Sequence, residues 1–418
     1  MAGIPEVDAA LRAAAHGHRG RLVALLAVRT RDIAAAEDAV AEAIAQACMS
    51  WPRDGIPQNP AGWLLAVARN RWRDMARHAQ VEADFAADWL HRFPEAAMAP
   101  DTEAGGVSDD RLKLMFVCAH PALHQAVHAP LMLQVVLGVP VERMAPLFLS
   151  SPGTLGQRLS RAKTKIRDAG IAFEMPSVEH LPSRLPAVLD ALYGAYCLGW
   201  EADGPDDAAT WSEMTGEAIY LARMLAAQLP SPEVLGLLAL MLWCESRRAG
   251  RRGAAGEFVP LDQQDVGCWD RAMMAEAAGL LAHASQAGQL GRYQLEAAIQ
   301  SVHAHRADSG DTDWHAIALL YRGLLAQSPT LGYQLGFISV LERLEGAEVA
   351  WEHLSALPRD TVRSYQPYWV LLAHLHEALG AMPEAEHARS VALGLTRNTA
   401  MRRHLERLGA SVAVMDAR

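Results

Sequence analysis

The pattern of residues 139–170 predicts a short helix, a tight break and a longer helix with two unlike faces. The segment reads VPVERMAPLFLSSPGTLGQRLSRAKTKIRDAG, with the break at Ser-Ser-Pro-Gly. Apolar residues share one side of the longer helix: Leu155, Leu159, Ala162 and Ile166. Polar and cationic residues lie opposite or beside them: Thr154, Gln157, Arg158, Arg161 and Lys165. The segment therefore predicts a helix-turn-helix whose apolar side docks on its own domain.

The polar side of this helix has the chemistry of a DNA-reading surface. Arginine and glutamine make paired hydrogen bonds with the edges of guanine and adenine in the major groove. The alternative is an ordinary amphipathic helix with a solvated charged face. This segment alone leaves both interpretations open.

The composition of the chain predicts an all-α fold. Aromatic residues make up 6% of the 418 residues, and long strand-like alternations are absent. The length allows two or three domains. Five cysteines stand without a Cys-x-x-Cys pair, which indicates a reducing compartment. No signal pattern and no long apolar run is present, so we expect a cytoplasmic protein that does not span a membrane.

Charge is distributed unevenly along the chain, whose formal net charge is −10. Residues 1–80 carry ten arginines against eight acidic residues, and residues 111–176 carry eight lysines and arginines against three. Residues 81–110 hold eight acidic residues against one arginine. Residues 177–418 therefore hold a net charge of −10. Because local charge governs phosphate contact, the two basic segments remain compatible with nucleic-acid binding.

The order of helices and turns divides the chain into four parts. We expect helices at residues 7–29 and 33–49 and a further helix that Asn59 and Pro60 open. In the C-terminal part, helix–Gly–helix units begin near Leu331 and Gln366, a spacing of about 35 residues that is typical of stacked tetratricopeptide-like (TPR-like) hairpins. The predicted parts are a first module at residues 5–80, an acidic linker at residues 81–110, a second module at residues 111–175 and a helical extension at residues 177–418.

Several short motifs follow one another in an order that points to one family. In the first module these are Asp32, residues 36–43 (AEDAVAEA), Trp51, residues 59–64 (NPAGWL) and residues 68–71 (ARNR). In the second they are residues 109–116 (DDRLKLMF), 120–123 (HPAL) and 157–167 (QRLSRAKTKIR). In the extension they include residues 217–223 (EAIYLAR), 233–241 (EVLGLLALM) and 311–314 (DTDW). The chain resembles the bacterial extracytoplasmic-function (ECF) sigma factors, in particular the subgroup with a long TPR-like helical extension.

The resemblance implies a role for each part of the chain. The first module would bind core RNA polymerase and melt the −10 promoter element, and the second would read the −35 element. An acidic edge would meet a basic coiled-coil hairpin of the polymerase: Asp32, Glu37, Asp38 and Glu42. Contacts at the −10 element would come from Asn70, Arg71, Arg73 and Arg77. Trp63 either stacks on nucleic acid or packs in the core, and we favour the core.

At the −35 element the resemblance and the helix chemistry agree. We expect bases to be read by Gln157, Arg158 and Arg161, and the duplex also to meet Thr154. Lys163, Lys165 and Arg167 would mainly position phosphates. The acidic extension would modulate activity by docking on the basic modules or on the polymerase.

Three other readings compete with a sigma factor. His120, His124 and His128 recur at four-residue spacing near Cys118, but no further ligand completes a metal site. Aspartates and histidines of residues 262–315 lack the motifs of an active site, and we expect caps and core there instead of an enzyme. We expect no cofactor. The remaining alternative is a helical-repeat adaptor that binds proteins, with vestigial sigma modules.

Overall fold

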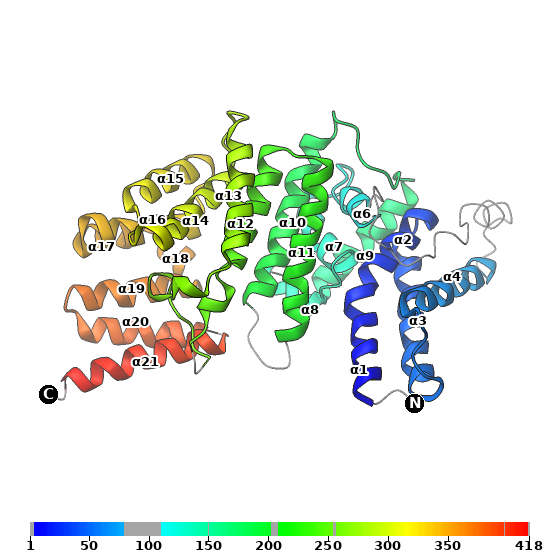
Figure 1. Ribbon diagram of the computed structural model, residues 1–418, viewed down its shortest axis with the longest axis horizontal. Helices are drawn as coiled ribbons and strands as arrows, with labels where there is room; N and C mark the ends of the chain where they lie inside the picture. The colour runs from blue at the N-terminus through cyan, green and yellow to red at the C-terminus, as the bar shows by residue number, and fades with distance from the viewer. Residues whose placement is uncertain are drawn as a thin grey trace. The chain divides into compact units, whose positions relative to one another are not determined.

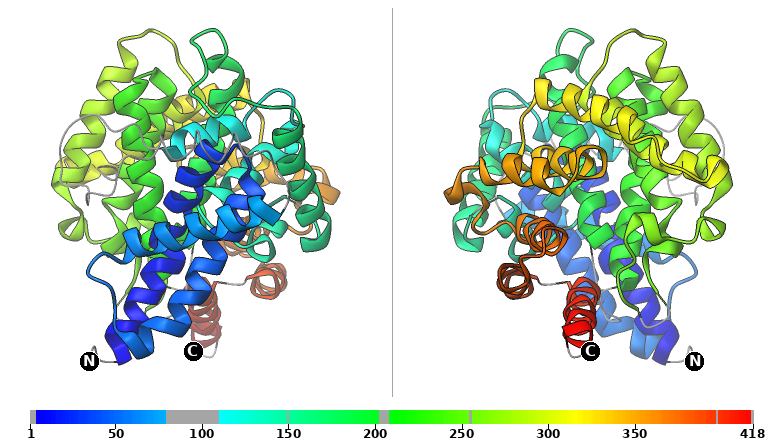
Figure 2. Two further views of the ribbon diagram at one scale, coloured as in Figure 1. Left: turned by 90° about the vertical axis from the view of Figure 1, so that its right-hand side faces the viewer. Right: turned by 90° about the vertical axis from the view of Figure 1, so that its left-hand side faces the viewer.

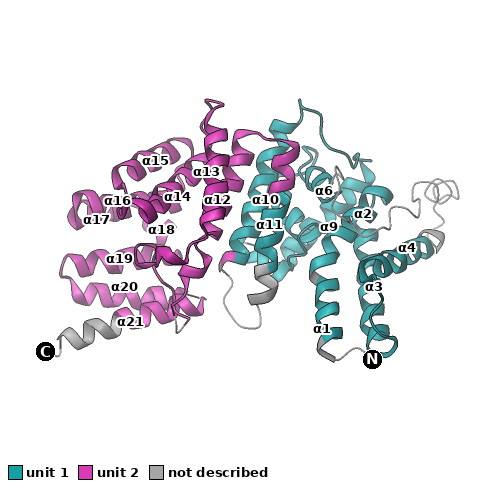
Figure 3. Ribbon diagram, viewed as in Figure 1, with its two compact units in different colours: residues 1–199, 212–221 teal, residues 200–211, 222–418 magenta. Residues whose placement is uncertain are grey.

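The structure is a computed structural model that describes residues 4–78, 110–148, 150–201, 208–253, 256–396 and 398–416. Helices dominate these residues (Figure 1), and extended pairing among them is limited to one isolated bridge between Arg252 and Phe258. The predicted all-α class is confirmed. The chain forms two compact units, residues 1–199 with 212–221 and residues 200–211 with 222–418 (Figure 3). The predicted linker lies outside the described residues, apart from Asp110.

The first module consists of α1 (Ile4–Arg12), α2 (Arg19–Thr30), α3 (Ile33–Asp54) and α4 (Pro60–His78). A π-helical turn at Ala13–His18 interrupts the single helix predicted for residues 7–29. Asp32 caps α3 by accepting a hydrogen bond from the backbone N–H of Ala35 at 3.1 Å. Asn59 accepts one from Gly62 at 2.9 Å, so the predicted start of α4 is confirmed.

The second module contains α6 (Asp110–Cys118), α7 (His128–Val135), α8 (Val141–Met144) and α9 (Pro152–Asp168). Pro146 falls within the residues predicted for the first helix of the helix-turn-helix. In the structure α8 ends before it, and a 3-10 turn at Ala145–Phe148 takes its place. Proline therefore removes no hydrogen bond from an α-helix interior there.

Two helices of the predicted extension also contribute to unit 1. They are α10 (Leu181–Glu201) and α11 (Ala208–Gln228), of which unit 1 includes residues up to 199 and residues 212–221. Arg184 of α10 donates to the carbonyl oxygen of Phe116 at 3.4 Å. Buried Arg111 of α6 pairs with Glu217 of α11 and lies over the Tyr220 ring. The second module thus obtains part of its support from residues beyond 175.

Unit 2 is a succession of helices in which most pack on the next helix in sequence, while α12 also packs on α14, and α16 and α17 also pack on α19. From α15 to α21 they lie one below another (Figure 1; Figure 2, right). None of the described helices combines the length and the apolar character needed to cross a bilayer. The helices of this unit after α11 are α12 (Pro232–Glu245), α13 (Arg271–Ser285), α14 (Arg292–Ser309), α15 (Trp314–Gln327), α16 (Leu331–Glu345), α17 (Ala347–Ser355), α18 (Arg359–Val362), α19 (Gln366–Ala378), α20 (Met382–Leu395) and α21 (Thr399–Asp416).

The two predicted helix–Gly–helix units are present in the structure. Helix α16 begins at Leu331 and is joined to α17 through Gly346, and α19 begins at Gln366 and is followed by Gly380 and α20. Both glycines have positive φ, at 98° and 75°, which a side chain would disfavour. The two helix–Gly–helix pairs share one apolar cluster that includes Leu335, Leu354 and Leu375. A TPR-like relationship remains a prediction.

Helices α12 and α14 approach each other closely at Gly236. A Cβ atom at this position would lie 2.7 Å from the backbone nitrogen of Gln294. Nearby, the Glu233 carboxylate accepts hydrogen bonds from the N–H groups of Tyr293 and Gln294 at 3.1 and 3.2 Å. These N–H groups belong to the first turn of α14, where helical partners are missing. One glycine and one carboxylate therefore fix this crossing.

Unit 2 also contains a histidine whose ionisation opposes folding. The His303 ring packs edge-on against Trp314, with 5.6 Å between ring centroids. Burial, followed by the charges of Arg247 and Arg306, lowers the pKa of His303 from 6.5 to about 4. The imidazole is therefore neutral in the folded protein at pH values where it is protonated in the unfolded chain.

We predict that His303→Gln reduces the acid sensitivity of folding. Because the folded-state pKa is depressed, the unfolded state binds the extra proton between pH 6.5 and 4, and stability falls as the pH is lowered through this window. At pH 5 the loss relative to pH 7.5 should be roughly 2 kcal/mol smaller in His303→Gln than in wild type. Urea unfolding at both pH values measures this difference. Equal acid sensitivity of the two proteins contradicts the prediction.

Candidate nucleic-acid and polymerase interface

Helix α9 begins with a well-formed cap at the predicted Ser-Ser-Pro-Gly break. The Ser151 hydroxyl accepts from the N–H of Thr154 at 3.2 Å and donates to the Thr154 hydroxyl at 2.9 Å. Pro152 occupies the first turn, where a missing N–H costs nothing. The four apolar residues predicted to face inward are all buried, with at most 6% exposure: Leu155, Leu159, Ala162 and Ile166.

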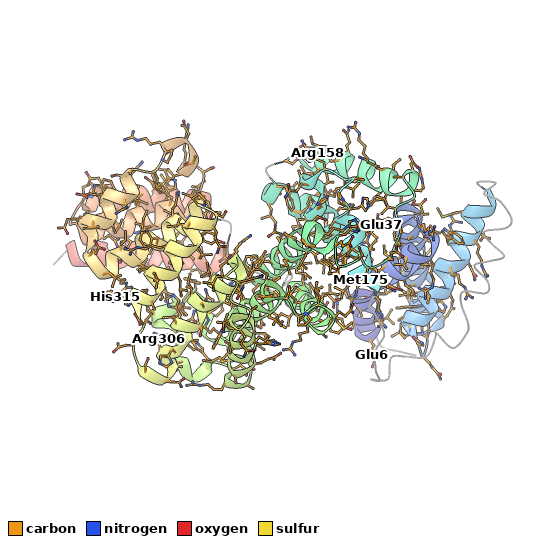
Figure 4. The ribbon with its side chains drawn as sticks, turned by 90° about the horizontal axis from the view of Figure 1, so that it is seen from above. Glu6, Glu37, Arg158, Met175, Arg306 and His315 are labelled. Atoms are coloured by element: carbon orange, nitrogen blue, oxygen red, sulfur yellow. The ribbon has the colours of Figure 1, made fainter. Side chains whose placement is uncertain are left out.

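The outward side of α9 has the composition predicted for a DNA-reading surface. Its exposed residues include Thr154, Gln157, Arg158, Arg161 and Lys165. Figure 4 places Arg158 at the outer edge of the unit. A Cβ atom at Gly153 or Gly156 would meet no atom within 4 Å, so the backbone at the start of α9 is open to close approach. Lys165 donates to the carbonyl oxygen of Ala122 at 2.5 Å, which holds its stem along the surface.

Two other cationic residues of α9 contact the first module. The Lys163 ammonium lies 2.5 Å from Oε2 of Glu37, and Nη1 of Arg167 lies 3.7 Å from Oδ2 of Asp32. Glu37 lies in α3 and Asp32 is its N-cap, so both pairs join α9 to the first module. The side chains of Lys163 and Glu37 are each only 12% exposed. Lys163, predicted to position phosphates, is thus occupied by a carboxylate in this structure.

Two of the four acidic residues predicted to meet the polymerase take part in this contact with α9. Glu37 also accepts from Nη2 of Arg19 at 3.2 Å, so its two oxygens hold cations of α2 and α9. Asp32 both caps α3 and pairs with Arg167. Asp38 and Glu42, in contrast, are exposed. The four acids therefore lie along the start of α3, and two of them already have cationic partners.

The first and second modules pack backbone against backbone at Gly20. A Cβ atom there would overlap the carbonyl oxygen of Val136, just after α7. Beside it, Arg19 donates to the carbonyl oxygen of Gln134 at 3.4 Å, and further along α2 Arg29 pairs with Asp110 at 3.2 Å. No motif of the sequence predicted these contacts between the two modules. The one available signal was a glycine in a helix interior, which is destabilising unless close packing requires it.

The residues predicted for the −10 element lie on α4. Asn70 and Arg71 are exposed, and Arg73 is partly buried. The side chain of Arg77 lies outside the described part of the chain. Trp63 is half-buried and meets the buried Trp51 edge-on, with 5.6 Å between ring centroids. This packing accords with the core role favoured for Trp63.

The histidines and the cysteine that suggested a metal site have structural roles. His120 and His124 accept hydrogen bonds through Nδ1 from Ala122 and Ala126, and Nε2 of His128 lies 3.2 Å from the carbonyl oxygen of Leu123. Burial raises the pKa of the nearby Cys118 thiol and so disfavours the thiolate that binds metals. Across the described residues, no three side chains of metal-binding type are grouped around a common point.

Three of the aspartates considered as candidate active-site residues are helix caps. Asp265 accepts from the N–H of Gly267 at 2.8 Å, Asp270 from Met273 at 2.9 Å and Asp313 from Ala316 at 2.9 Å. Each carboxylate thereby satisfies an N–H group at the start of a helical turn. The expectation of caps at these positions is confirmed.

Comparisons with known proteins identify two regions of the chain. Residues 15–81 match sigma-70 region 2. Residues 184–285 match a family of unknown function, DUF6596. An uncharacterized protein of Rhizobium meliloti (strain 1021) is 34% identical over 396 residues, which cover 92% of each chain. No solved structure matches the chain.

The sigma-70 match covers most of the helices that position the acidic edge of α3 and the polar side of α4. The relative is similar over nearly the whole length, including the extension. The chain therefore belongs to the same family as the Rhizobium meliloti protein, and residues 15–81 are a sigma-70 region 2.

Proposed function

We propose that the protein is an alternative sigma factor of the ECF type, which binds core RNA polymerase and directs promoter-specific transcription initiation. Its sigma-70 region 2 supports a sigma-factor-like role with polymerase and promoter DNA as partners. Helix α9 gives the proposal its main support. It follows region 2 within unit 1, its N-terminus is capped, and it exposes amide, hydroxyl and guanidinium groups. Such a protein would act in the cytoplasm, would not be an enzyme and would need no cofactor.

In this proposal the polymerase binds at the start of α3. Asp38 and Glu42 are one helical turn apart and exposed, so they offer two carboxylates to a basic surface at little desolvation cost. Asp32 and Glu37 extend the same edge. A basic coiled-coil hairpin of the polymerase, implied by the resemblance, has the complementary charge.

We predict that Asp38→Arg/Glu42→Arg weakens binding to core RNA polymerase. Reversing two exposed charges replaces attraction by repulsion and should lower the affinity roughly tenfold or more. Glu142→Arg/Glu174→Arg is the matched control, because it reverses two exposed acids of unit 1 that lie outside α3 and outside the extension. Titration of labelled protein with core polymerase measures both. Equal affinities of the two variants would place the polymerase contact elsewhere.

At the promoter, the proposal assigns α4 to the −10 element and α9 to the −35 element. Asn70, Arg71, Arg73 and Arg77 would contact the melted or duplex DNA along α4. On α9, Gln157, Arg158 and Arg161 would read bases, while Thr154 and Lys165 would meet the sugar–phosphate backbone. The open backbone at Gly153 and Gly156 supports a close approach of α9 to the groove.

We predict that Arg161→Ala and Lys165→Ala weaken DNA binding in different ways, the first at specific sequences and the second at all sequences. Arg161→Ala should weaken binding to DNA selected by the wild-type holoenzyme by about 5- to 150-fold and relax its sequence preference. Lys165→Ala should weaken selected and random DNA alike and reduce the salt dependence by about one ion. Arg359→Ala, an exposed arginine of α18, is the control. Uniform loss in both α9 variants would contradict base reading by Arg161.

We further propose that the C-terminal helices modulate this activity through their negative charge. Residues 177–418 carry −10 and the two basic segments carry +2 and +5, so attraction between them is expected. The contact would be intramolecular or with the polymerase. In either case the extension would gate promoter use.

We predict that removing residues 229–418, which carry −4 of the −10 of residues 177–418, raises DNA affinity about twofold at low salt, because part of the acidic competitor for the basic surfaces is lost. Truncation at 229 retains α10 and α11, which contribute to unit 1. DNA titrations at two salt concentrations and promoter-specific transcription assays compare the truncated and full chains. Unchanged DNA affinity together with unchanged transcription would rule out modulation by residues 229–418.

A further inference from the structure

We propose that α9 covers the start of α3 in the free protein and that core RNA polymerase must displace it in order to bind. The α3–α9 contact consists of the ion pairs Lys163–Glu37 and Arg167–Asp32. The inference rests on the proposed function, because it takes the acidic edge of α3 to be the polymerase surface. It adds that the subunit has a closed form in which part of that surface is occupied by its own DNA-binding module.

Burial distinguishes the Lys163–Glu37 pair from an ordinary surface ion pair. Exposed pairs contribute little because water competes for both charges, but here each side chain is 12% exposed. The partners are 126 residues apart in sequence, so the contact reports the arrangement of two modules. Arg167, half exposed, extends the contact to the N-cap of α3.

The packing beneath the ion pairs shows that the closed form is a fitted interface. The contact of Gly20 with the carbonyl oxygen of Val136 excludes even a methyl group from between α2 and the end of α7. Arg29 pairs with Asp110 further along the same interface. Apolar residues of both modules are fully buried, including Leu26 of α2 and Leu112 of α6.

Electrostatics makes the closed form and polymerase binding compete. A basic polymerase surface carries the same sign of charge as Lys163 and Arg167, so it cannot approach Glu37 and Asp32 while those cations remain in place. Asp38 and Glu42 stay exposed and offer a first point of attachment. Attachment there followed by displacement of α9 would exchange one set of cations for another at the same carboxylates.

The structure also supplies a variant that weakens the contact without leaving a buried charge unpaired. When Lys163 is replaced, Glu37 keeps Arg19 on its other oxygen at 3.2 Å. Lys163→Gln therefore removes the α9 partner while α3 retains its fold. Arg167→Gln is a second variant, at a half-exposed position where the risk of misfolding is small.

Carbodiimide cross-linking of the full-length protein tests the closed form directly. The reagent joins a carboxylate to an amine in contact with it, and the whole chain contains only three lysines, Lys113, Lys163 and Lys165. We expect a Lys163–Glu37 amide in the digest of the free protein. Lys113, whose ammonium lies 2.9 Å from Asp110, supplies the internal control. A Lys113–Asp110 product without any Lys163–Glu37 product would overturn the closed form.

Addition of core RNA polymerase tests the competition. Saturating polymerase should suppress the Lys163–Glu37 product and spare the Lys113–Asp110 product. Lys163→Gln should bind core polymerase roughly 3- to 10-fold more tightly than wild type, because the binding-competent fraction rises. Arg167→Gln should shift the affinity in the same direction by less, and Arg359→Gln, at an exposed position of α18, should not change it.

The outcomes separate this inference from the proposed function. Tight polymerase binding with an undiminished Lys163–Glu37 product, or with no gain in Lys163→Gln and Arg167→Gln, would overturn the competition and leave the sigma-factor function standing. Absence of polymerase binding in wild type and in every variant would overturn the proposed function, and the competition with it.

Discussion

The close packing of α2 against the backbone at Val136 is the constraint on which unit 1 depends. Only glycine at residue 20 allows this approach. Arg19, which pairs with Glu37 within the first module, also reaches the carbonyl oxygen of Gln134 across this approach, and Arg29 pairs with Asp110. A sigma-70 region 2 and the helices that follow it are thereby held as one body, and α3 is brought beside α9.

Helix α9 has three distinct sides as a consequence. One side buries Leu155, Leu159, Ala162 and Ile166, a second presents Lys163 and Arg167 to α3, and the third faces outward with Gln157, Arg158 and Arg161. Lys163 and Lys165 are two residues apart and have opposite environments, one inside an ion pair and one on the surface. Position around the helix, and not residue type, decides which cation is available to DNA in the closed form.

The sequence was sufficient to predict what depends on local pattern. Helical periodicity and turn chemistry predicted the all-α class, the capped starts of α4 and α9 and the helix–Gly–helix units at Leu331 and Gln366. They did not predict that the N-terminal part of α10 would complete unit 1 or that Lys163 would pair with Glu37. Periodicity shows which side of a helix is polar but not which distant segment lies against it. Tertiary contact across 126 residues leaves no trace in local spacing.

The most direct test of the account is transcription by core RNA polymerase to which this protein alone has been added. The template is DNA selected from a random pool by the protein–polymerase complex, and the product is mapped by its 5′ end. The account predicts initiation at a fixed position on selected DNA, dependent on the added protein. Absence of a protein–polymerase complex together with absence of transcripts would contradict it and would leave an all-helical scaffold in place of a sigma factor.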